Sequence, residues 1–294
     1  MNEHLKGLLI TTMGVLLIVP DSLFVRLIVA EPPTVAFFRG LVSGGIILLV
    51  LLAVQGAAGF RAVLRTGKPG LIYVLLIGLT TPGFVMAVTQ TSVANVVFIF
   101  ASIPIFASIF SRIFLGEPIQ MRMVLTMGGV MIGLGIIAYG SGSSEIAHWK
   151  GDLWALCVSA SYAAALTAVR KVKDTSMIPA IPVAYIGAAL VMLPWATPVE
   201  TFQTQWQLVL GHGAFIAAGT CLLTLGPRYI SSAEVSLLIL LESVLAPILV
   251  WVVVGEDPGP WALVGGAVVI GALFVSNLIA LLGRSRRAVP TLKP

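Results

Sequence analysis

The sequence predicts an all-α polytopic membrane protein, with ten transmembrane helices arranged as two inverted five-helix repeats and both termini in the cytoplasm. Only 10% of the 294 residues are charged and 58% are hydrophobic, whereas about 25% of an average soluble domain is charged. Apolar runs of about 20 residues recur, each long enough to cross a hydrocarbon core of ~30 Å as a helix. The two halves of the chain also share a residue pattern. Together these observations exclude a water-soluble protein.

The hydropathy pattern also predicts the domain organisation. Lys6 is followed at once by an apolar run with no A-x-A-like cleavage site before the next span, so we expect a retained helix and not a signal peptide. The predicted spans are 5–29, 34–55, 69–88, 92–114, 121–139, 151–169, 178–197, 208–226, 233–254 and 261–282. We therefore expect a first repeat at 1–140, a polar Gly/Ser-rich linker at 141–150, a second repeat at 151–283 and a basic cytoplasmic tail at 284–294.

Matching residues in the two halves indicate an internal duplication. An offset of 139 residues places Gly116-Glu117 on Gly255-Glu256 and Ala94 on Ala233. An offset of 144 aligns the segment 7–26 with 151–170, and both segments begin with Gly and end with Arg. Self-similarity in the same order is the signature of repeated architecture. An odd number of spans per repeat inserts the second copy upside down, as in many secondary transporters.

The basic residues predict the orientation of the chain. With the N-terminus in the cytoplasm, fourteen of the seventeen Lys and Arg residues fall on the inner side. Arg26 and Lys150 fall outside, and Arg39 lies within a span. Because Lys and Arg concentrate on the cytoplasmic side of membrane proteins, this distribution predicts both termini inside. It also accounts for the basic character of the chain without a nucleic-acid partner.

Glu242 is the strongest candidate for a functional residue. It lies near the middle of the apolar run Ala233–Val254. A charge at that depth costs about 2.5–3.5 kcal/mol, so such a residue is turned inward and given a partner, a cavity or a proton. The alternative is a structural Glu that is hydrogen-bonded within the bundle. Glu234 differs, because Ser231 and Glu234 fit a capping box at a helix start.

Asp21 and Arg39 are the other intramembrane charges. Pro20 interrupts the first span in its outer half, because proline lacks the N–H and clashes with the preceding turn. Two structural interpretations are open: Asp21-Ser22 caps the following segment, or Asp21 pairs with Arg39, unless Arg39 snorkels to the outer interface. The functional interpretation is a broken helix that exposes a carboxylate and backbone groups to a central cavity.

Hydroxyl and aromatic residues at mid-depth complete the candidate site, although small polar residues in spans also serve helix packing. The predicted solute-binding residues are Asp21, Thr80, Phe84, Phe98, Ser102, Ser159, Tyr162, Thr220, Glu242 and Ser243, with Trp154 as a further apolar wall. The predicted structural or gating residues are Pro20, Arg39, Pro82, Gly83, Pro104 and Pro247, with a helix break at Pro82-Gly83. The small-residue pairs Gly40/Gly44, Gly129/Gly133 and Ala267/Gly271 allow close contact within the bundle or across a dimer, so monomer and homodimer both stay open.

No motif indicates catalysis. His4, His148 and His212 fall at or near predicted span ends, and no H-E-x-x-H, G-x-S-x-G or Walker A sequence occurs. Cys157 and Cys221 fall inside apolar spans and are most simply packing residues. We expect no enzyme activity, metal or cofactor. The expected partners are a small-molecule solute and membrane lipid.

The repeated pattern resembles a known family. An apolar helix with Pro104 or Glu242 near its middle, a Gly-Glu pair at its end and a following Gly-rich helix are similar to the EamA family of the drug/metabolite transporter superfamily. Arg39-Gly40 before a Leu/Val/Ile-rich run resembles the second helix of that family, and the resemblance covers residues 5–282. It implies a ten-helix inverted repeat in the bacterial inner membrane, closest to the YddG-like amino-acid exporters. Two departures are the missing tryptophan of the first helix and Ser243 in place of a proline.

The sequence therefore predicts a secondary transporter that exports small neutral metabolites, amino acids first among them, by alternating access. If export is proton-coupled, Glu242 and Asp21 are the best titratable candidates, and a facilitator is equally allowed. One alternative is a multidrug exporter of apolar cations with Glu242 as counter-charge. The other is a non-transporting scaffold or lipid-handling subunit whose polar residues only pack helices.

Overall fold

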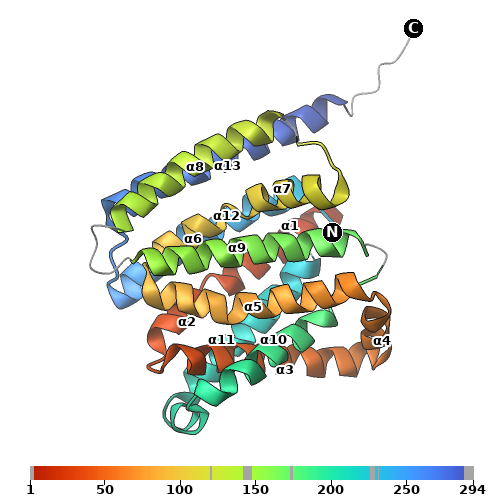
Figure 1. Ribbon diagram of the computed structural model, residues 1–294, viewed down its shortest axis with the longest axis vertical. Coiled ribbons are helices and arrows are strands. Elements are labelled where there is room, and N and C mark those ends of the chain that lie inside the picture. The colour runs from red at the N-terminus through yellow and green to blue at the C-terminus, as the bar shows by residue number, and fades with distance from the viewer. Residues whose placement is uncertain are drawn as a thin grey trace.

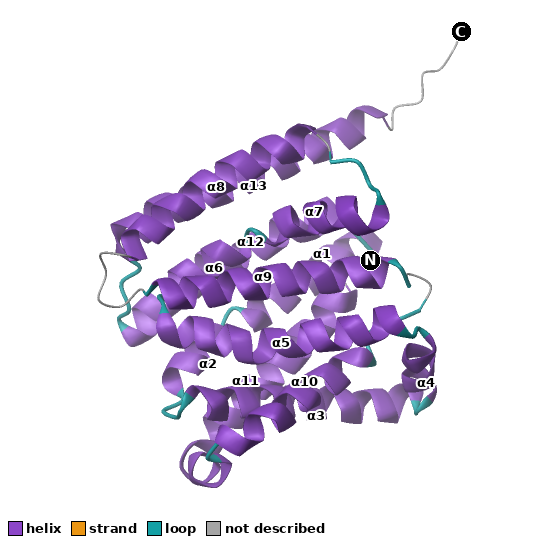
Figure 2. Ribbon diagram, viewed as in Figure 1, coloured by secondary structure: helices purple, strands orange, loops and turns teal. Residues whose placement is uncertain are grey.

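The computed structural model describes residues 3–119, 121–141, 148–172, 175–225, 229–230 and 232–287, without the side chains of 122, 141, 170, 232–237, 240, 277 and 280–287. The described chain is helical, with short connections (Figures 1 and 2). Its helices are α1 (Glu3–Ile18), α2 (Asp21–Leu27), α3 (Pro32–Gln55), α4 (Ala58–Arg65), α5 (Lys68–Gln90), α6 (Val93–Phe100), α7 (Ile103–Leu115), α8 (Met121–Ser141), α9 (Trp149–Arg170), α10 (Ala180–Met192) with the 3₁₀ turn η1 (Leu193–Trp195), α11 (Pro198–Leu225), α12 (Ser232–Val254) and α13 (Gly259–Arg287).

Eight helical segments of the described chain are long and apolar enough to cross a membrane. Two of them combine shorter helices, namely Glu3–Leu27, which joins α1 and α2, and Val93–Leu115, which joins α6 and α7. Two further apolar helices, Ala180–Trp195 and Leu241–Val254, are shorter. The chain is therefore a multi-pass membrane protein. The count of ten spans stays a prediction.

The packing of the helices repeats between the two halves. α5 packs on α9 as α1 packs on α11, and α7 packs on α9 as α1 packs on α12. α3 packs on α10 and α8 on α13, so these two pairs join each helix to its own counterpart. Figure 1 shows α8 and α13 side by side along one edge of the bundle, with α3, α10 and α11 at the other. Exchanging the halves therefore maps the main helix pairs onto one another.

Two glycines show the same equivalence at atomic detail. A Cβ added at Gly151 would lie 2.6 Å from Thr91 N, and one added at Gly7 would lie 2.6 Å from Cγ2 of Ile230. The 144-residue offset pairs Gly7 with Gly151, and the 139-residue offset pairs Thr91 with Ile230. The first helix of each half thus contacts the segment after the third span through a residue without a side chain.

Of the two helix breaks predicted at prolines, one is present in the structure and one is not. The break at Pro20 is confirmed, because α1 ends at Ile18 and α2 begins at Asp21. The break predicted at Pro82-Gly83 is wrong, since α5 runs through both residues. Membrane helices tolerate an internal proline when neighbouring helices enclose it. Gly83 instead permits a close approach to α9, because an added Cβ would lie 2.6 Å from Val158 Cγ2.

Other boundaries differ in smaller ways. Pro104 lies in the first turn of α7, after a two-residue interruption between α6 and α7. Pro247 lies inside the continuous α12. The short helix α4 occupies a connection where no helix was predicted. The centre of the predicted linker (142–147), the end of the tail (288–294) and the capping box at Ser231 and Glu234 lie outside the described residues and side chains.

Large apolar side chains cover the outside of the bundle. Leu49, Leu75 and Val252 are 69%, 63% and 77% exposed, although each lies within an apolar helix. The core holds fully buried aliphatic residues from both halves, such as Val85 and Ile216. An exposed apolar belt of this extent suits lipid and not water.

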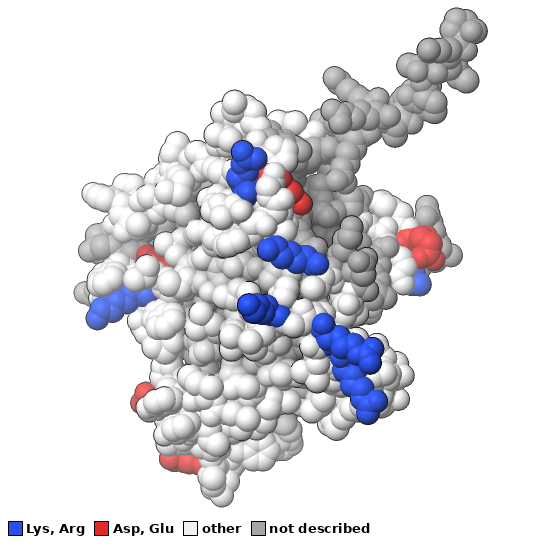
Figure 3. All heavy atoms as spheres, turned by 45° about the vertical axis from the view of Figure 1, so that its right-hand side comes forward, with Lys and Arg blue, Asp and Glu red and all other residues white. Residues whose placement is uncertain are grey.

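Charged residues lie mainly at the two ends of the bundle. Arg26 and Lys150 are at the end reached by α2 and the start of α9, which we call the Arg26 end. The opposite end carries Lys6, Arg61, Arg65, Lys68, Arg112 and Lys171. Figure 3 turns the side of Figure 1 that holds α4 toward the viewer and shows several Lys and Arg side chains on the visible face.

Glycines of two predicted small-residue pairs lie at close contacts between helices of this chain. A Cβ at Gly133 would lie 2.8 Å from the carbonyl oxygen of Gly265 in α13, and one at Gly44 would lie 2.9 Å from Ile186 in α10. These glycines, predicted to pack either within the bundle or across a dimer, therefore face helices of the same chain.

Gly133→Leu is expected to destabilise the protein strongly, because the added side chain meets the backbone of α13. Overpacking of this kind costs about 1–3 kcal/mol or more. Gly135→Leu on the same helix is the matched control, since no described atom lies within 4 Å of a Cβ added there. Thermal unfolding in detergent measures the difference. Equal unfolding temperatures for the two variants would show that α8 and α13 are not packed in this way.

Candidate functional site

Asp21 and Arg39 form a buried ion pair between α2 and α3. Arg39 Nη2 donates to Asp21 Oδ2 at 2.6 Å, and Arg39 Nε donates to Asp21 Oδ1 at 3.1 Å. The two residues are 4% and 8% exposed. The ion-pair interpretation of the sequence is confirmed. The capping interpretation is wrong, because Pro20 occupies the N-cap and the Asp21 carboxylate is bonded to Arg39.

His212 is the third member of this cluster, and its predicted position at a span end is wrong. It lies in the middle of α11, is 1% exposed, and its Nε2 is 2.7 Å from Asp21 Oδ1. An ionised carboxylate only accepts hydrogen bonds, so Nε2 donates. The ring stacks on Phe24, with ring centroids 5.4 Å apart. His212 Nδ1 is buried without a hydrogen-bond partner in the described part of the chain.

The functional position of His212 is hard to predict from the sequence, because the eighth span is predicted to begin at residue 208. The stretch 198–207 reads as a connection, but α11 starts at Pro198 and runs through it with one non-helical residue, Gln205. A signal was nevertheless present. His212 lies between two glycines in an apolar run, and an ionisable residue within a span is a functional candidate by default.

Thr81 and Phe84 of α5 enclose the Arg39 guanidinium. Arg39 Nη1 donates to Thr81 Oγ1 at 3.3 Å, and Arg39 Cζ lies 4.8 Å from the centroid of the Phe84 ring. Phe84 was predicted as a wall for solute, whereas it is 6% exposed and covers the cation. Thr80, which was predicted to bind solute, instead donates to the Ile77 carbonyl within its own helix. Arg39 is thus held on several sides.

Glu242 lies across from this cluster, on α12 of the second half. It is half-buried and within electrostatic range of Asp21, Arg39 and Tyr162. Tyr185 is within the same range of Arg39 and Tyr162. No hydrogen bond or ion pair joins the Glu242 carboxylate to another described residue. Glu242 is therefore the charged group of the cluster that is left available for another partner.

The remaining predicted residues have packing contacts of their own. Ser102 and Ser159 both donate to the Ile99 carbonyl at the interruption between α6 and α7, and Ser243 donates to the Val97 carbonyl at 3.5 Å. Phe98 is buried and would touch any side chain added at Gly266. The carbonyl of Thr220, which is half-buried, accepts a bond from Thr224. Tyr162, another predicted solute-binding residue, is 40% exposed and within electrostatic range of Glu242.

The site is a buried cluster of ion-paired side chains with a further carboxylate within electrostatic range. Within the described residues, no group of three His, Cys, Asp or Glu side chains is placed to hold a metal. What the site offers is a compensated Asp–Arg–His cluster, an adjacent carboxylate and tyrosine hydroxyls.

Comparison with known proteins agrees with this fold. A solved structure described only as "Crystal structure of protein" is 18% identical, with a TM-score of 0.65 over 97% of this chain and 99% of the other. At this identity the likeness shows the fold alone. No curated protein matches the chain. The model of the EamA-like transporter family matches twice, at residues 5–139 and 149–278. Because these two matches cover most of the sequence, the chain belongs to the EamA-like transporter family, whose members are membrane transporters of the drug/metabolite type.

Proposed function

We propose that the protein is a secondary transporter that exports small neutral metabolites, amino acids first among them, across the bacterial inner membrane by alternating access. One observation carries the proposal. Glu242 of the second repeat is without a hydrogen-bond partner among the described residues, yet it lies within electrostatic range of the compensated Asp21–Arg39 pair of the first repeat. Intramembrane charges of this kind mark substrate pathways.

The charges of the cluster favour a solute that carries an amine. The Arg39 charge is matched by Asp21, with which it forms two hydrogen bonds, so Glu242 is the unmatched charge. An ammonium group at Glu242 neutralises it. A carboxylate on the same solute can accept a hydrogen bond from the hydroxyl of Tyr162, a residue that is 40% exposed. A zwitterion therefore brings both groups without adding net charge to a low-dielectric site.

The internal duplication supports alternating access. Helix pairs that join the two halves recur when each helix is exchanged for its counterpart. In transporters built from inverted repeats, the site lies at the repeat interface near the bilayer midplane, and one repeat rocks against the other. Asp21, Arg39 and Glu242 fit that description, because they come from both repeats and lie within the apolar segments Glu3–Leu27, Pro32–Gln55 and Ser232–Val254.

The charged ends support an orientation with both termini in the cytoplasm. Lys and Arg of the described chain gather at the end that holds α4, whereas Glu31, Glu200, Glu256 and Asp257 lie at the Arg26 end. By the positive-inside rule the α4 end is cytoplasmic. The Arg26 end is then the outer end.

Counterflow in liposomes tests the function. Purified protein is reconstituted, and saturable exchange of labelled amino acids and of apolar organic cations is measured beside empty liposomes. We expect amino-acid counterflow. Counterflow of cations alone would instead favour the multidrug exporter, for which an unpaired Glu242 is also a suitable counter-charge. Folded protein that moves no tested solute would contradict the proposal and favour the scaffold alternative.

A further inference from the structure

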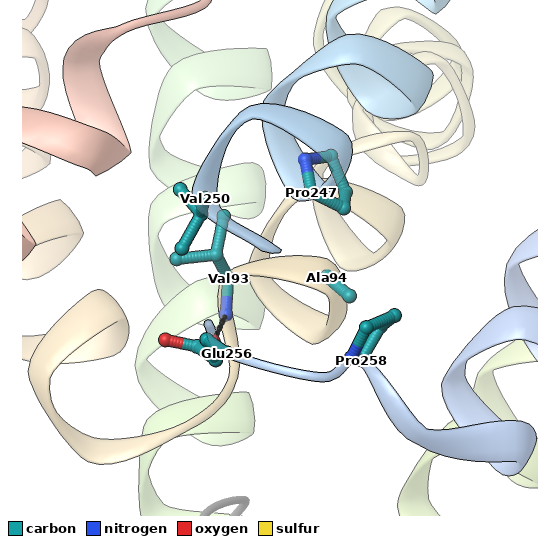
Figure 4. Close-up of a pocket in the computed structure, with 6 residues that line it drawn as sticks. All are labelled: Val93, Ala94, Pro247, Val250, Glu256 and Pro258. Carbon is teal, nitrogen blue, oxygen red and sulfur yellow. Dashed lines mark hydrogen bonds between the residues drawn. The ribbon is translucent and has the colours of Figure 1, made fainter. Parts of the chain in front are cut away.

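The Gly255-Glu256 turn after α12 reaches across to the first repeat. Gly255 ends the helix in left-handed backbone, with φ of 78°. Glu256 then lies against the start of α6, where its Oε1 accepts a hydrogen bond from Val93 N at 2.7 Å (Figure 4). A carboxylate at this place satisfies a backbone N–H that the helix leaves without a partner, and it interacts favourably with the helix dipole. The turn that ends one repeat's helix thus caps a helix of the other repeat.

Arg26 of α2 strengthens this contact. Its Nε lies 2.7 Å from Glu256 Oε2, and its Nη2 donates to the Thr91 carbonyl at 2.9 Å. The two charged side chains are 19% and 9% exposed. Breaking a mostly buried ion pair is costly, because each charge loses its partner without regaining full hydration. We call Arg26, Thr91, Val93 and Glu256 the Glu256 latch.

The latch is continuous with the start of α9. Thr91 Oγ1 donates to Asp152 Oδ1 at 2.7 Å. Directly beneath the latch, α6 and α12 meet around a hollow too narrow to hold a water molecule (Figure 4). The residues that line it are Val93, Ala94, Pro247, Val250, Glu256 and Pro258. α6 and α12 are therefore closely packed at this end while the latch is formed.

The duplication places an equivalent turn at the opposite end. Gly116 ends α7 with φ of 71°, and Glu117 follows it. The 139-residue offset pairs Glu117 with Glu256, and Val93 with Ser232, the first residue of α12. The counterpart of Arg26 is Arg170, whose side chain lies outside the described part of the chain.

We propose that Glu256 holds the Arg26 end closed by capping a helix of the other repeat, and that Glu117, its counterpart under the 139-residue offset, is the gate residue of the α4 end. Glu256 leaves Arg26 and Val93 when the Arg26 end opens. The duplication assigns Glu117 the equivalent release at the α4 end. The inference rests on the proposed alternating access and identifies the residues that decide which end is open.

Sided labelling of a single cysteine tests the two gates. The reporter is Ser243→Cys, beside Glu242 and beyond the latch, in a Cys157→Ala/Cys221→Ala background. A membrane-impermeant thiol reagent is applied to one face of the membrane at a time. Thr80→Cys serves as a second reporter if Ser243→Cys does not fold.

Each gate variant is expected to open one end only. Glu256→Gln should raise labelling from the Arg26 end roughly tenfold, equivalent to about 1.4 kcal/mol, and leave the other end unchanged. Glu117→Gln should do the reverse. Glu256→Ala should exceed Glu256→Gln, because glutamine still accepts from Val93 N. Asp257→Asn is the matched control, since Asp257 accepts from Gly259 N instead, and it should change neither rate.

Two results would contradict the proposed role of the gate residues. One is unchanged labelling in Glu256→Ala protein that unfolds at the wild-type temperature. The other is an equal rise from both ends, which would indicate general loosening. The labelling assay does not depend on transport of a solute. If the gate variants change labelling at one end as expected but no solute shows counterflow, the proposed function is contradicted and the gates are not. If amino acids show counterflow but the gate variants leave labelling unchanged, the gates are contradicted and the proposed function is not.

Discussion

Replacing Asp21 by asparagine is expected to lower the unfolding temperature of the purified protein by roughly 10 °C. The substitution leaves the guanidinium of Arg39, which is 8% exposed, with no carboxylate partner. Removing one partner of a buried ion pair costs about 3–5 kcal/mol. In a chain of this size each kcal/mol shifts the midpoint by about 2–4 °C. Thermal unfolding in detergent, followed by the loss of monodisperse protein, gives the measurement.

A double variant separates charge from packing. Arg39→Leu alone leaves Asp21 with His212 as its remaining side-chain partner, so it too should be destabilising. Asp21→Asn/Arg39→Leu buries no uncompensated charge and should unfold at a higher temperature than either single variant. Glu31→Gln is the control, because Glu31 is exposed and its side chain makes no capping bond. A double variant no more stable than the worse single variant would mean that the two charges do not stabilise each other.

Glu242→Gln is expected to reduce amino-acid counterflow at least tenfold and to leave the unfolding temperature nearly unchanged. Hydrogen bonds to a charged group contribute about 1.5–3 kcal/mol, and tenfold corresponds to about 1.4 kcal/mol. Folding should tolerate the change, because the carboxylate has no hydrogen-bond partner among the described residues to lose. Initial counterflow rates of the two proteins give the comparison.

Glu200→Gln is the matched control for Glu242→Gln, since it removes an exposed carboxylate at the Arg26 end. Ser159→Ala tests the packing alternative, because Ser159 bonds to backbone carbonyls. A scaffold protein would tolerate both Glu242→Gln and Ser159→Ala. A multidrug exporter would lose cation flux in Glu242→Gln and keep any flux of zwitterions.

Hydropathy predicted the existence of most helices, because a chain that must satisfy its backbone within lipid has few alternatives to a helix. Hydropathy could not predict the ends of helices whose first or last turns are polar. The segment 201–207 reads as a connection, yet it continues α11 and carries His212 into the centre of the bundle. Hydropathy also did not predict the short helix α4, because an amphipathic helix of 8 residues does not form an apolar run long enough to indicate a membrane span.

The sequence suggested that Asp21 pairs with Arg39, but it did not show which threonine of α5 faces Arg39. Asp21 and Arg39 lie at similar predicted depth, so the cost of isolated charges suggested their pairing, and the structure confirms it. Thr80 and Thr81 are neighbours with the same chemistry, but they point about 100° apart on a helix. Thr81 contacts Arg39, whereas Thr80 bonds within α5. That choice depends on the rotation of α5, which composition does not encode.

The most direct test of the central claim is equilibrium binding of a labelled amino acid to purified protein. The claim is that solute binds between the Asp21–Arg39–His212 cluster and Glu242. The amino acid with the fastest counterflow is titrated against wild type, Glu242→Gln and Glu200→Gln. The claim predicts saturable binding that weakens at least tenfold in Glu242→Gln and is unchanged in Glu200→Gln. Equal affinity in all three proteins would place the solute elsewhere and contradict it.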